Sequence, residues 1–267
     1  MGHSSHSVAS PWRHSALPAL FGLLIAAAPW LSPARAAEQI GADNNNIDNP
    51  FVQPPGVAAD QSQQNGDVLV GTRGVDVQIG LLGSDTILGN RGRDVQIGGP
   101  DPGPPNNDRA FGGPGYDVFL WQPGDGSDFF DGGREDDAIV FGNIANVDGL
   151  PTLDPDTGLP EINVTDNAGF CEVIDGTDPA DAAELEALGL DDLVQFFARG
   201  EADDGDADGD NGLRVTLHLI DVEYAVCAVR EGGEIEVFDL RVSPPVIIDI
   251  EDIENERLRT RLEDIVL

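Results

Sequence analysis

Three nine-residue segments, GTRGVDVQI, GLLGSDTIL and GNRGRDVQI, follow one another without a gap from Gly71 to Ile97. Each has glycine at its first and fourth positions and aspartate at its sixth. Glycine permits positive φ and close backbone approach, so G-x-x-G-x-D predicts a turn, and the residues after it predict a short β-strand. Such a strand is stable only when neighbouring units stack on it. The period therefore predicts a small unit repeated along a solenoid.

Stacking would place the sixth-position aspartates of neighbouring turns roughly 4.8 Å apart, which is the strand spacing. Like charges at that distance repel and resist full ionisation together. Ca²⁺ takes about six to eight oxygen ligands from carboxylates and backbone carbonyls, and glycine-rich turns expose such carbonyls. These residue types favour calcium as the bound ion. The alternative, a disordered Gly/Asp-rich linker, is disfavoured by the regular spacing of the acids from Asp67 to Asp94.

The repeats resemble the haemolysin-type, or RTX, calcium-binding family, whose nonapeptide is G-G-x-G-x-D-x-U-x with U a large apolar residue. The resemblance implies a parallel β-roll in which two nonapeptides make one turn and Ca²⁺ lies between turns, in contact with motifs two apart. It implies that Asp67 pairs with Asp85 and Asp76 with Asp94. The residues expected at the metal sites are Asp67, Gly71, Gly74, Asp76, Gly80, Gly83, Asp85, Gly89, Gly92, Asp94, Asp108, Gly112, Gly115, Asp117, Asp128 and Asp137.

The match to the family pattern is uneven along the chain. GGPGYDVFL, residues 112–120, is nearly complete, whereas the repeat that begins at Gly132 has Glu135 at its fourth position. Gln78 and Gln96 stand where the large apolar residue belongs, so we expect weaker core packing in those half-turns. The segment PDPGPPNN breaks the period and is expected to form a loop. Two further acids in the last repeats, Asp125 and Asp131, are candidate accessory ligands.

Residues 1–36 have the features of a secretory signal segment. Arg13 ends a weakly basic start, an apolar run follows from Ala16, and Ala34-Arg35-Ala36 matches a small-x-small cleavage pattern. A membrane anchor is disfavoured because the run is short and contains two prolines, so no transmembrane segment is expected in the mature chain. The location predicted is secreted, periplasmic or cell-surface. Residues 37–64 are polar and predict a flexible lead-in.

The net charge is −35, from 49 acidic and 14 basic residues. With so few basic residues, nucleic acid is not an expected partner. Cations are the natural partners of such a chain. A role of the charge in solubility or salt tolerance also fits and does not exclude ion binding.

The composition changes after Gly142, and the period of nine ends. Residues 143–248 predict a smaller β-rich or α+β module, and residues 249–267 a C-terminal amphipathic helix. The overall prediction is thus a mainly β protein in which a β-roll over residues 65–142 precedes this module. Within the module we expect strands over 170–174, 213–229 with a break near Ile220, and 234–242, and helices over 180–188 and 191–199.

An acidic loop within the module has the pattern D-x-D-x-D-G of an EF-hand. Its twelfth position holds Val215 instead of the bidentate glutamate, so a full EF-hand is not supported. A non-standard calcium loop and a solvated acidic loop both fit the pattern. The weaker metal candidates are Asp204, Asp206, Asp208 and Asp210.

Two cysteines, Cys171 and Cys227, both fall on expected strands of the module. An even cysteine count in an exported chain predicts a disulfide. Closing a loop of this length would stabilise the fold by roughly 4 kcal/mol in the chain-entropy model.

No catalytic motif is found in the sequence: H-E-x-x-H, G-x-S-x-G and a phosphate-binding glycine loop are all missing. The chain is therefore expected not to be an enzyme. The leading hypothesis is an exported calcium-binding protein whose repeats fold when Ca²⁺ binds. One alternative is a calcium-dependent adhesion or surface-matrix protein whose partner is the cell envelope or a polysaccharide. The other is an enzyme with an unrecognised site in residues 146–248.

Overall fold

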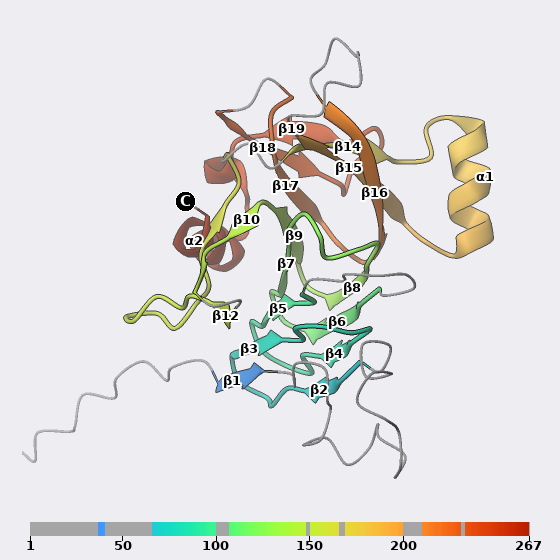
Figure 1. Ribbon diagram of the computed structural model, residues 1–267. Coiled ribbons are helices and arrows are strands. Elements are labelled where there is room, and N and C mark those ends of the chain that lie inside the picture. Colours follow the sequence, from blue (N-terminus) through green and yellow to red (C-terminus); the bar gives the residue numbers. More distant parts are fainter. Residues whose placement is uncertain are drawn as a thin grey trace, which may run out of the picture. The chain divides into compact units, whose positions relative to one another are not determined.

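Figure 1 shows the chain as a computed structural model. The structure describes residues 37–40, 66–99, 107–147, 150–165, 169–199, 210–230 and 233–266. The expected signal segment lies outside these residues, and so do most of the expected lead-in and the candidate ligands Asp204, Asp206 and Asp208. The side chain of Asp210 is likewise not described. Within the described ranges, no helix is long and apolar enough to cross a membrane.

Two large β-sheets form most of the described chain. Sheet A contains β1 (Ala37–Ile40), β3 (Asp76–Ile79), β5 (Val95–Ile97), β7 (Val118–Trp121), β9 (Ala138–Phe141), β17 (Tyr224–Ala228), β18 (Ile235–Asp239) and β19 (Val246–Ile248), in this order across the sheet. Sheet B contains, in spatial order, β14 (Gly169–Ile174), β15 (Asp192–Arg199), β16 (Asp210–Ile220), β8 (Phe129–Arg134), β6 (Arg109–Pro114), β4 (Thr86–Leu88) and β2 (Val68–Val70). The fold is therefore mainly β, as the sequence predicts.

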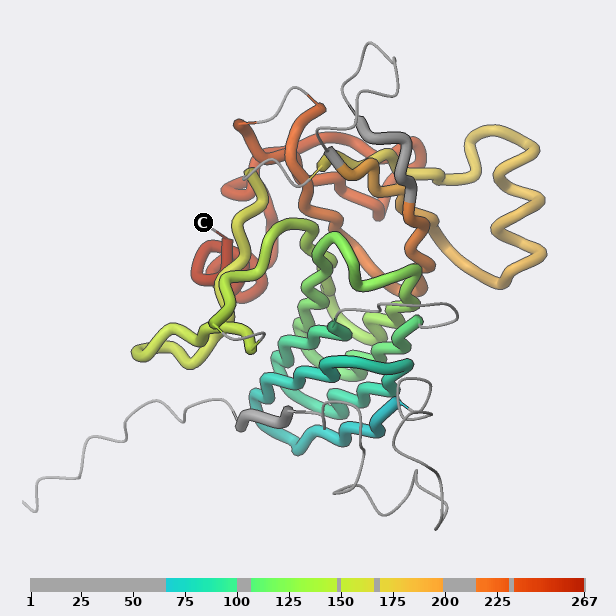
Figure 2. The backbone as a smooth tube through the Cα atoms, in the orientation of Figure 1, coloured from blue at the N-terminus to red at the C-terminus, as the bar shows by residue number. Residues whose placement is uncertain are grey.

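Strands β2 to β9 coil into a parallel β-roll. Successive strands alternate between the sheets, so each full turn uses two nonapeptides, as the family resemblance implies. The register follows the repeat, because Val77 pairs with Val95 and Val95 with Val118 in successive turns. Figure 2 shows this coil from its first turn, in cyan, to its last, in green. Residues 37–40, expected in a flexible lead-in, instead form β1 and pair in parallel with β3.

Close stacking of the turns explains the glycines. A Cβ added to Gly92 would lie 2.1 Å from the carbonyl oxygen of Gly74 in the neighbouring turn. The second position of the repeat adopts positive φ, as at Gly113, where φ is 97°. Leu81 and Asn90 take the same position with φ of 72° and 73°. Asparagine tolerates this region better than leucine, so the repeat that contains Leu81 carries local strain.

The main core fills the space between the two sheets. Phe130 faces it from sheet B and Phe119 from sheet A, and both are fully buried. Gln78 and Gln96 lie in the same row of sheet A as Phe119. Gln96 Nε2 donates to Gln78 Oε1 at 3.2 Å, and Gln78 Nε2 donates to the carbonyl of Leu88 at 3.2 Å. These hydrogen bonds offset part of the packing that the glutamines were expected to lose.

A second core covers the outer face of sheet A. The C-terminal helix α2 (Glu256–Ile265) buries Leu258, Leu262 and Ile265 against strand residues such as Ile79 and Val95. The apolar face predicted for this helix is therefore the face that packs. Short strands between the roll and β14 complete the cover: β10 (Asn143–Ile144), β11 (Asn146–Val147), β12 (Leu150–Pro151) and β13 (Ile162–Asn163).

Both sheets continue beyond the boundary predicted after Gly142. Strand β16 pairs in parallel with β8, and β17 pairs in parallel with β9, so the C-terminal half extends the sheets of the roll. The remaining strands then pair antiparallel. The predicted disulfide joins Cys171 in β14 to Cys227 in β17, with the Cα atoms 5.9 Å apart. It therefore links sheet B to sheet A.

The two helices expected before residue 200 have different outcomes. Helix α1 (Pro179–Leu188) is confirmed: the Asp178 side chain caps its first turn, and Gly189 ends it with φ of 68°. The second helix, over 191–199, is wrong, because these residues form strand β15. Alternate positions Val194 and Phe196 are buried in the inter-sheet core, and the pairing of β15 with both β14 and β16 outweighs local helix propensity.

Candidate metal centre

Two columns of aspartates run along the two edges of the roll. In each column, the backbone N–H of one aspartate donates to Oδ1 of the aspartate in the next turn. The distance is 2.9 Å from Asp76 to Asp94, 2.7 Å from Asp94 to Asp117 and 2.6 Å from Asp117 to Asp137. The second column runs through Asp67, Asp85, Asp108 and Asp128. The structure thus brings together both expected pairs, Asp67 with Asp85 and Asp76 with Asp94.

The second carboxylate oxygen has a different environment. Oδ2 is buried and has no hydrogen-bond partner in Asp85, Asp94, Asp117 and Asp137, as the described part of the chain shows. A buried carboxylate oxygen without a donor is costly, so it needs either a proton or a cation. The other oxygen of the same group already holds the neighbouring turn in place.

First-position glycines keep a narrow space open beside these oxygens. A Cβ added to Gly112 would lie 2.6 Å from Asp117 Oδ2 and also 2.6 Å from the carbonyl oxygen of Gly132. At Gly89 the same Cβ would lie 2.7 Å from Asp94 Oδ2 and 2.6 Å from the Gly112 carbonyl. Carboxylate and carbonyl oxygens from consecutive turns therefore border one space, which any side chain larger than glycine would fill.

Burial strongly perturbs the ionisation of the columns. It raises the pKa of Asp85 and Asp94 to about 7 and that of Asp117 to about 8, and the neighbouring aspartate of the column adds to each rise. The pKa of Asp137 rises to about 10, again chiefly by burial, with Asp117 and Glu223 as the nearest like charges. Without a cation, the columns therefore retain protons near neutral pH.

The donor set is one of oxygens alone. Both cysteines are in the disulfide, so neither supplies a thiolate. Among the residues that the structure describes, no three or more His, Cys, Asp or Glu side chains converge on one point. An ion between turns would therefore be held by carboxylates together with the glycine carbonyls. This set suits a hard cation such as Ca²⁺ and does not suit Zn²⁺ or copper.

Glu223, which the sequence analysis did not single out, extends the column of Asp76. The backbone N–H of Asp137 donates to Glu223 Oε2 at 2.7 Å, as it would to a further aspartate. A turn over 221–223 joins β16 to β17, and Asp221 has φ of 48°. Its carbonyl oxygen would lie 2.3 Å from a Cβ on Gly132, in the place that first-position glycine carbonyls take elsewhere. The sequence signal that could have identified Glu223 is an acid directly before the short apolar strand that begins at Tyr224.

The accessory candidates are not members of the hydrogen-bonded columns. Asp125 is buried in the turn between β7 and β8, where its Oδ2 accepts from the backbone N–H of Gln122 at 3.1 Å. Burial raises its pKa to about 7. Asp131 lies within β8, and burial and two nearby acids, Asp221 and Asp191, raise its pKa.

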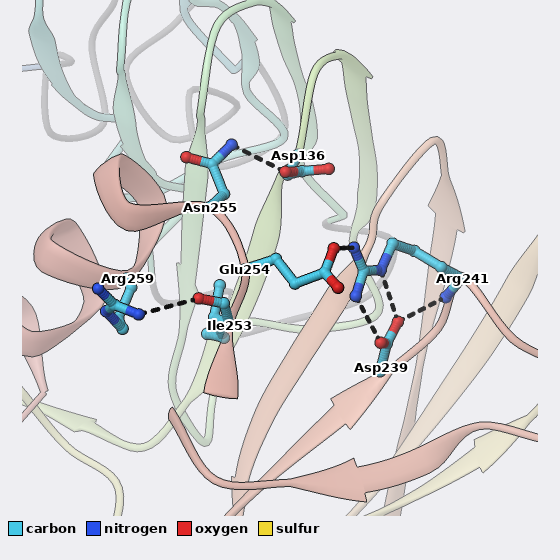
Figure 3. Close-up of polar contacts among 7 residues, drawn as sticks. All are labelled: Asp136, Asp239, Arg241, Ile253, Glu254, Asn255 and Arg259. Atoms are coloured by element: carbon cyan, nitrogen blue, oxygen red, sulfur yellow. Dashed lines mark hydrogen bonds and ion pairs between the residues drawn. The ribbon is translucent and has the colours of Figure 1, made fainter. Parts of the chain in front are cut away.

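The C-terminal helix is tied to the last turn of the roll. Figure 3 shows Asn255 pointing at Asp136, and Asn255 Nδ2 donates to Asp136 Oδ2 at 2.8 Å. The Asn255 Oδ1 atom caps α2 by accepting from the backbone N–H groups of Arg257 and Leu258. The pKa values of Asp94 and Asp117 are raised chiefly by burial, and the positive charge of buried Arg261, from the same helix, opposes that rise. One helix therefore both positions the last repeat and partly offsets the charge of one column.

Comparison with known proteins assigns no family to this chain. No protein-family description matches the sequence, and no curated protein matches it. The solution structure of the AlgE6R3 subunit from the Azotobacter vinelandii mannuronan C5-epimerase is similar in part. It is 22% identical, the match covers 63% of this chain and 77% of that chain, and the TM-score is 0.29. The RTX-like β-roll therefore rests on the strand pairing observed in this chain.

Proposed function

We propose that this is an exported protein that binds Ca²⁺ between the turns of its β-roll and folds on binding. The observation that carries the proposal is the aspartate column at each edge of the roll. In the best-defined rungs, one carboxylate oxygen binds the neighbouring turn, while the other is buried without a partner beside a glycine carbonyl. A cation in that space would serve both carboxylate and carbonyl oxygens.

Electrostatics supplies the reason for folding on binding. Ionised aspartates separated by about one strand spacing, roughly 4.8 Å, oppose closure of the roll. Calcium removes this repulsion and gains ligands that exist together only in the folded state, so its binding free energy becomes folding free energy. Extracellular calcium modules bind at roughly 10⁻⁴ to 10⁻³ M, a range that would keep such a roll open inside a cell and closed outside.

Export is the second part of the proposal. A leader over residues 1–36 and the disulfide between Cys171 and Cys227 both suit an oxidising compartment. Expression with the leader intact should yield mature protein outside the cytoplasm that begins near Ala37. Full-length protein retained in the cytoplasm, with its N-terminal residues still attached, would contradict this part alone.

The calcium proposal is tested on the mature chain by circular dichroism and thermal unfolding, in chelator and in 5 to 10 mM CaCl₂, which is about tenfold above the expected range of Kd. We expect β-signal and melting temperature to rise with calcium, and to rise much less with equal MgCl₂, because Mg²⁺ demands a smaller octahedral site. A spectrum and a melting temperature that do not change in calcium would contradict the proposal.

A further inference from the structure

Four exposed arginines gather at one edge of the roll. Arg73 and Arg91 hold the third position of their nonapeptides, and these nonapeptides stack as consecutive turns because β3 pairs with β5. Arg93 follows two residues after Arg91, and Arg257 comes from the first turn of α2. We call these four residues the arginine edge. Neighbouring rungs lie roughly 4.8 Å apart, so the edge presents positive charges in a row along the roll.

A shallow groove runs over the arginine edge. An open hollow of about 530 Å³ is lined by all four arginines, and Pro114, Tyr116 and Glu135 complete much of its wall. A second open hollow of about 610 Å³ lies on the other side of Arg73 and Arg91, next to Gly71 and Asn90. The two hollows share these arginines, so a ligand longer than one side chain has room along the column.

Elsewhere in the described ranges, three arginines form ion pairs and three others, Arg109, Arg134 and Arg261, do not. Arg230 pairs with Glu172, Arg241 with Asp239, and Arg259 with Glu263. Within the described residues, none of the four arginines of the edge forms an ion pair, although acidic residues outnumber basic ones 49 to 14. The unpaired guanidinium groups are therefore available to a ligand.

In the three consecutive nonapeptides from Gly71 to Ile97, third-position arginine lies on one edge of the roll. The nonapeptides that begin at Gly71 and Gly89 have arginine at position three, whereas the intervening repeat, which turns at the opposite edge, has Leu82 there. Pro114 holds this position in the next turn of the same edge, so the row consists of Arg73 and Arg91, with Arg93 and Arg257 beside it. A linear array on one edge fits a ligand whose own charges repeat along a line.

We propose that the arginine edge binds a carboxylated polysaccharide. Guanidinium groups bind carboxylates through paired hydrogen bonds, and a polymer whose sugar rings carry carboxylates presents such groups repeatedly along its length. Duplex nucleic acid carries a charge every ~1.7 Å of its axis and would be repelled more strongly by a protein of net charge −35. The proposal goes beyond calcium binding, since it assigns a polymer partner to the arginine side chains of turns whose glycines, Gly74 and Gly92 among them, are expected at the metal sites.

The test measures binding of the mature chain, in calcium, to carboxymethyl-dextran and to unmodified dextran by biolayer interferometry. We expect binding to the carboxylated polymer only. The double variant Arg73→Ala/Arg91→Ala should bind about tenfold more weakly, as two exposed ion pairs are lost. The matched control is Arg109→Ala, which removes an exposed arginine from sheet B, where it lies over the Phe129 ring, and should bind as the parent does.

Several outcomes would overturn the proposal. They are equal binding to both dextrans, unchanged binding by the double variant, and an equal loss in Arg109→Ala, which would indicate a general charge effect. Tighter binding to duplex DNA than to carboxymethyl-dextran would show that the polymer class is wrong. Circular dichroism and the melting temperature in calcium confirm that each variant is folded, so a loss of binding is assigned to the surface. If the protein does not respond to calcium at all, the metal proposal fails while the polymer result still stands.

Discussion

At the scale of single residues, the two carboxylate oxygens of an aspartate in the roll have different roles. In Asp117, Oδ1 accepts the backbone N–H of Asp94, while Oδ2 is buried beside the carbonyl of Gly132. The hydrogen bond sets the register of the turns, and the remaining oxygen creates the demand for a cation. The glycines matter for the same reason, since they leave the space in which such an ion would lie.

Gly112→Ala tests that space. The new Cβ would lie 2.6 Å from Asp117 Oδ2 and from the Gly132 carbonyl, so we expect a loss of about 1–3 kcal/mol in the free energy of unfolding and weaker calcium binding. Denaturant unfolding in calcium measures the first effect and calorimetric titration the second. Gly74→Ala is the steric control: Gly74 is also expected at a metal site, but alanine keeps its backbone carbonyl, and the new Cβ would meet only Thr72 Oγ1, at 3.6 Å. Equal effects of the two substitutions would show that the space beside Asp117 is not special.

Glu223→Gln tests the closing rung of the column. Glutamine keeps an oxygen that can accept the N–H of Asp137 but loses the negative charge. If Glu223 ligates Ca²⁺, stabilisation by calcium should fall by about 2.7 kcal/mol at 100 times the Kd of one site, and one ion should be lost from the calorimetric stoichiometry. Glu184→Gln, on the exposed face of α1, should change neither. An unchanged stoichiometry would leave Glu223 as a hydrogen-bond cap only.

At the scale of elements, each strand of the roll is too short to be stable alone, and its neighbours supply what it lacks. On one side, strands β3 and β5 face the core between the two sheets, which contains Phe119. On the other side they face helix α2, so sheet A is covered on both faces. The helix is thus a structural part of the roll, and Asn255 fastens it to the last repeat through Asp136 (Figure 3). Loss of helix packing should therefore also destabilise the turns that carry the aspartate columns.

Leu262→Ala tests this coupling. Leu262 is fully buried against sheet A, and truncation of a buried leucine costs about 2–5 kcal/mol. We expect the melting temperature to fall and the calcium concentration needed for folding to rise, because both report the same cooperative unit. Thr260→Ala, at an exposed position of the same helix, should leave both values near those of the parent. A lower melting temperature with an unchanged calcium midpoint would show that helix and roll fold separately.

At the scale of the whole molecule, a rise in pH is expected to change the stability of the fold in opposite directions with and without bound metal. The folded-state pKa values of Asp85 and Asp94 are raised from 3.8 to about 7, and that of Asp117 to about 8. For groups with a raised pKa, the stabilising contribution is fully present below about 3.8 and is lost as pH rises through 7 to 8. Calcium is expected to reverse the sign of this pH dependence, because it would bind the ionised carboxylates.

The melting temperature in chelator should therefore fall between about pH 5 and about pH 8.5, a range that includes these pKa values, whereas in saturating calcium it should rise or stay level. Scans at about 0.5 M NaCl screen the general repulsion of the acidic surface and leave the buried columns as the main cause. A melting temperature that rises with pH in chelator would contradict the burial of uncompensated aspartates in the columns.

Much of the roll follows from local sequence. The period of nine correctly predicts short strands that stack in a repeating unit, and the resemblance to the RTX family adds the parallel roll, two nonapeptides per turn and the pairing of Asp76 with Asp94. The break near Ile220 and the C-terminal helix are also confirmed. The error at β15 has a clear origin, since a segment with helical propensity becomes a strand when strands from both sides offer it hydrogen bonds. Local propensity is the weaker effect there.

The sequence by itself determined the repeating unit, because glycine and aspartate at fixed spacing satisfy the backbone geometry and hydrogen bonding of each turn. It also determined the disulfide and the apolar face of the last helix. Only the tertiary structure decided that β16 and β17 continue the sheets of the roll and that Glu223 closes a column begun by Asp76. It alone aligned Arg73, Arg91 and Arg257 on one edge. These arrangements join residues that are far apart in the chain, and a contact of that kind leaves no period or motif in the sequence around it.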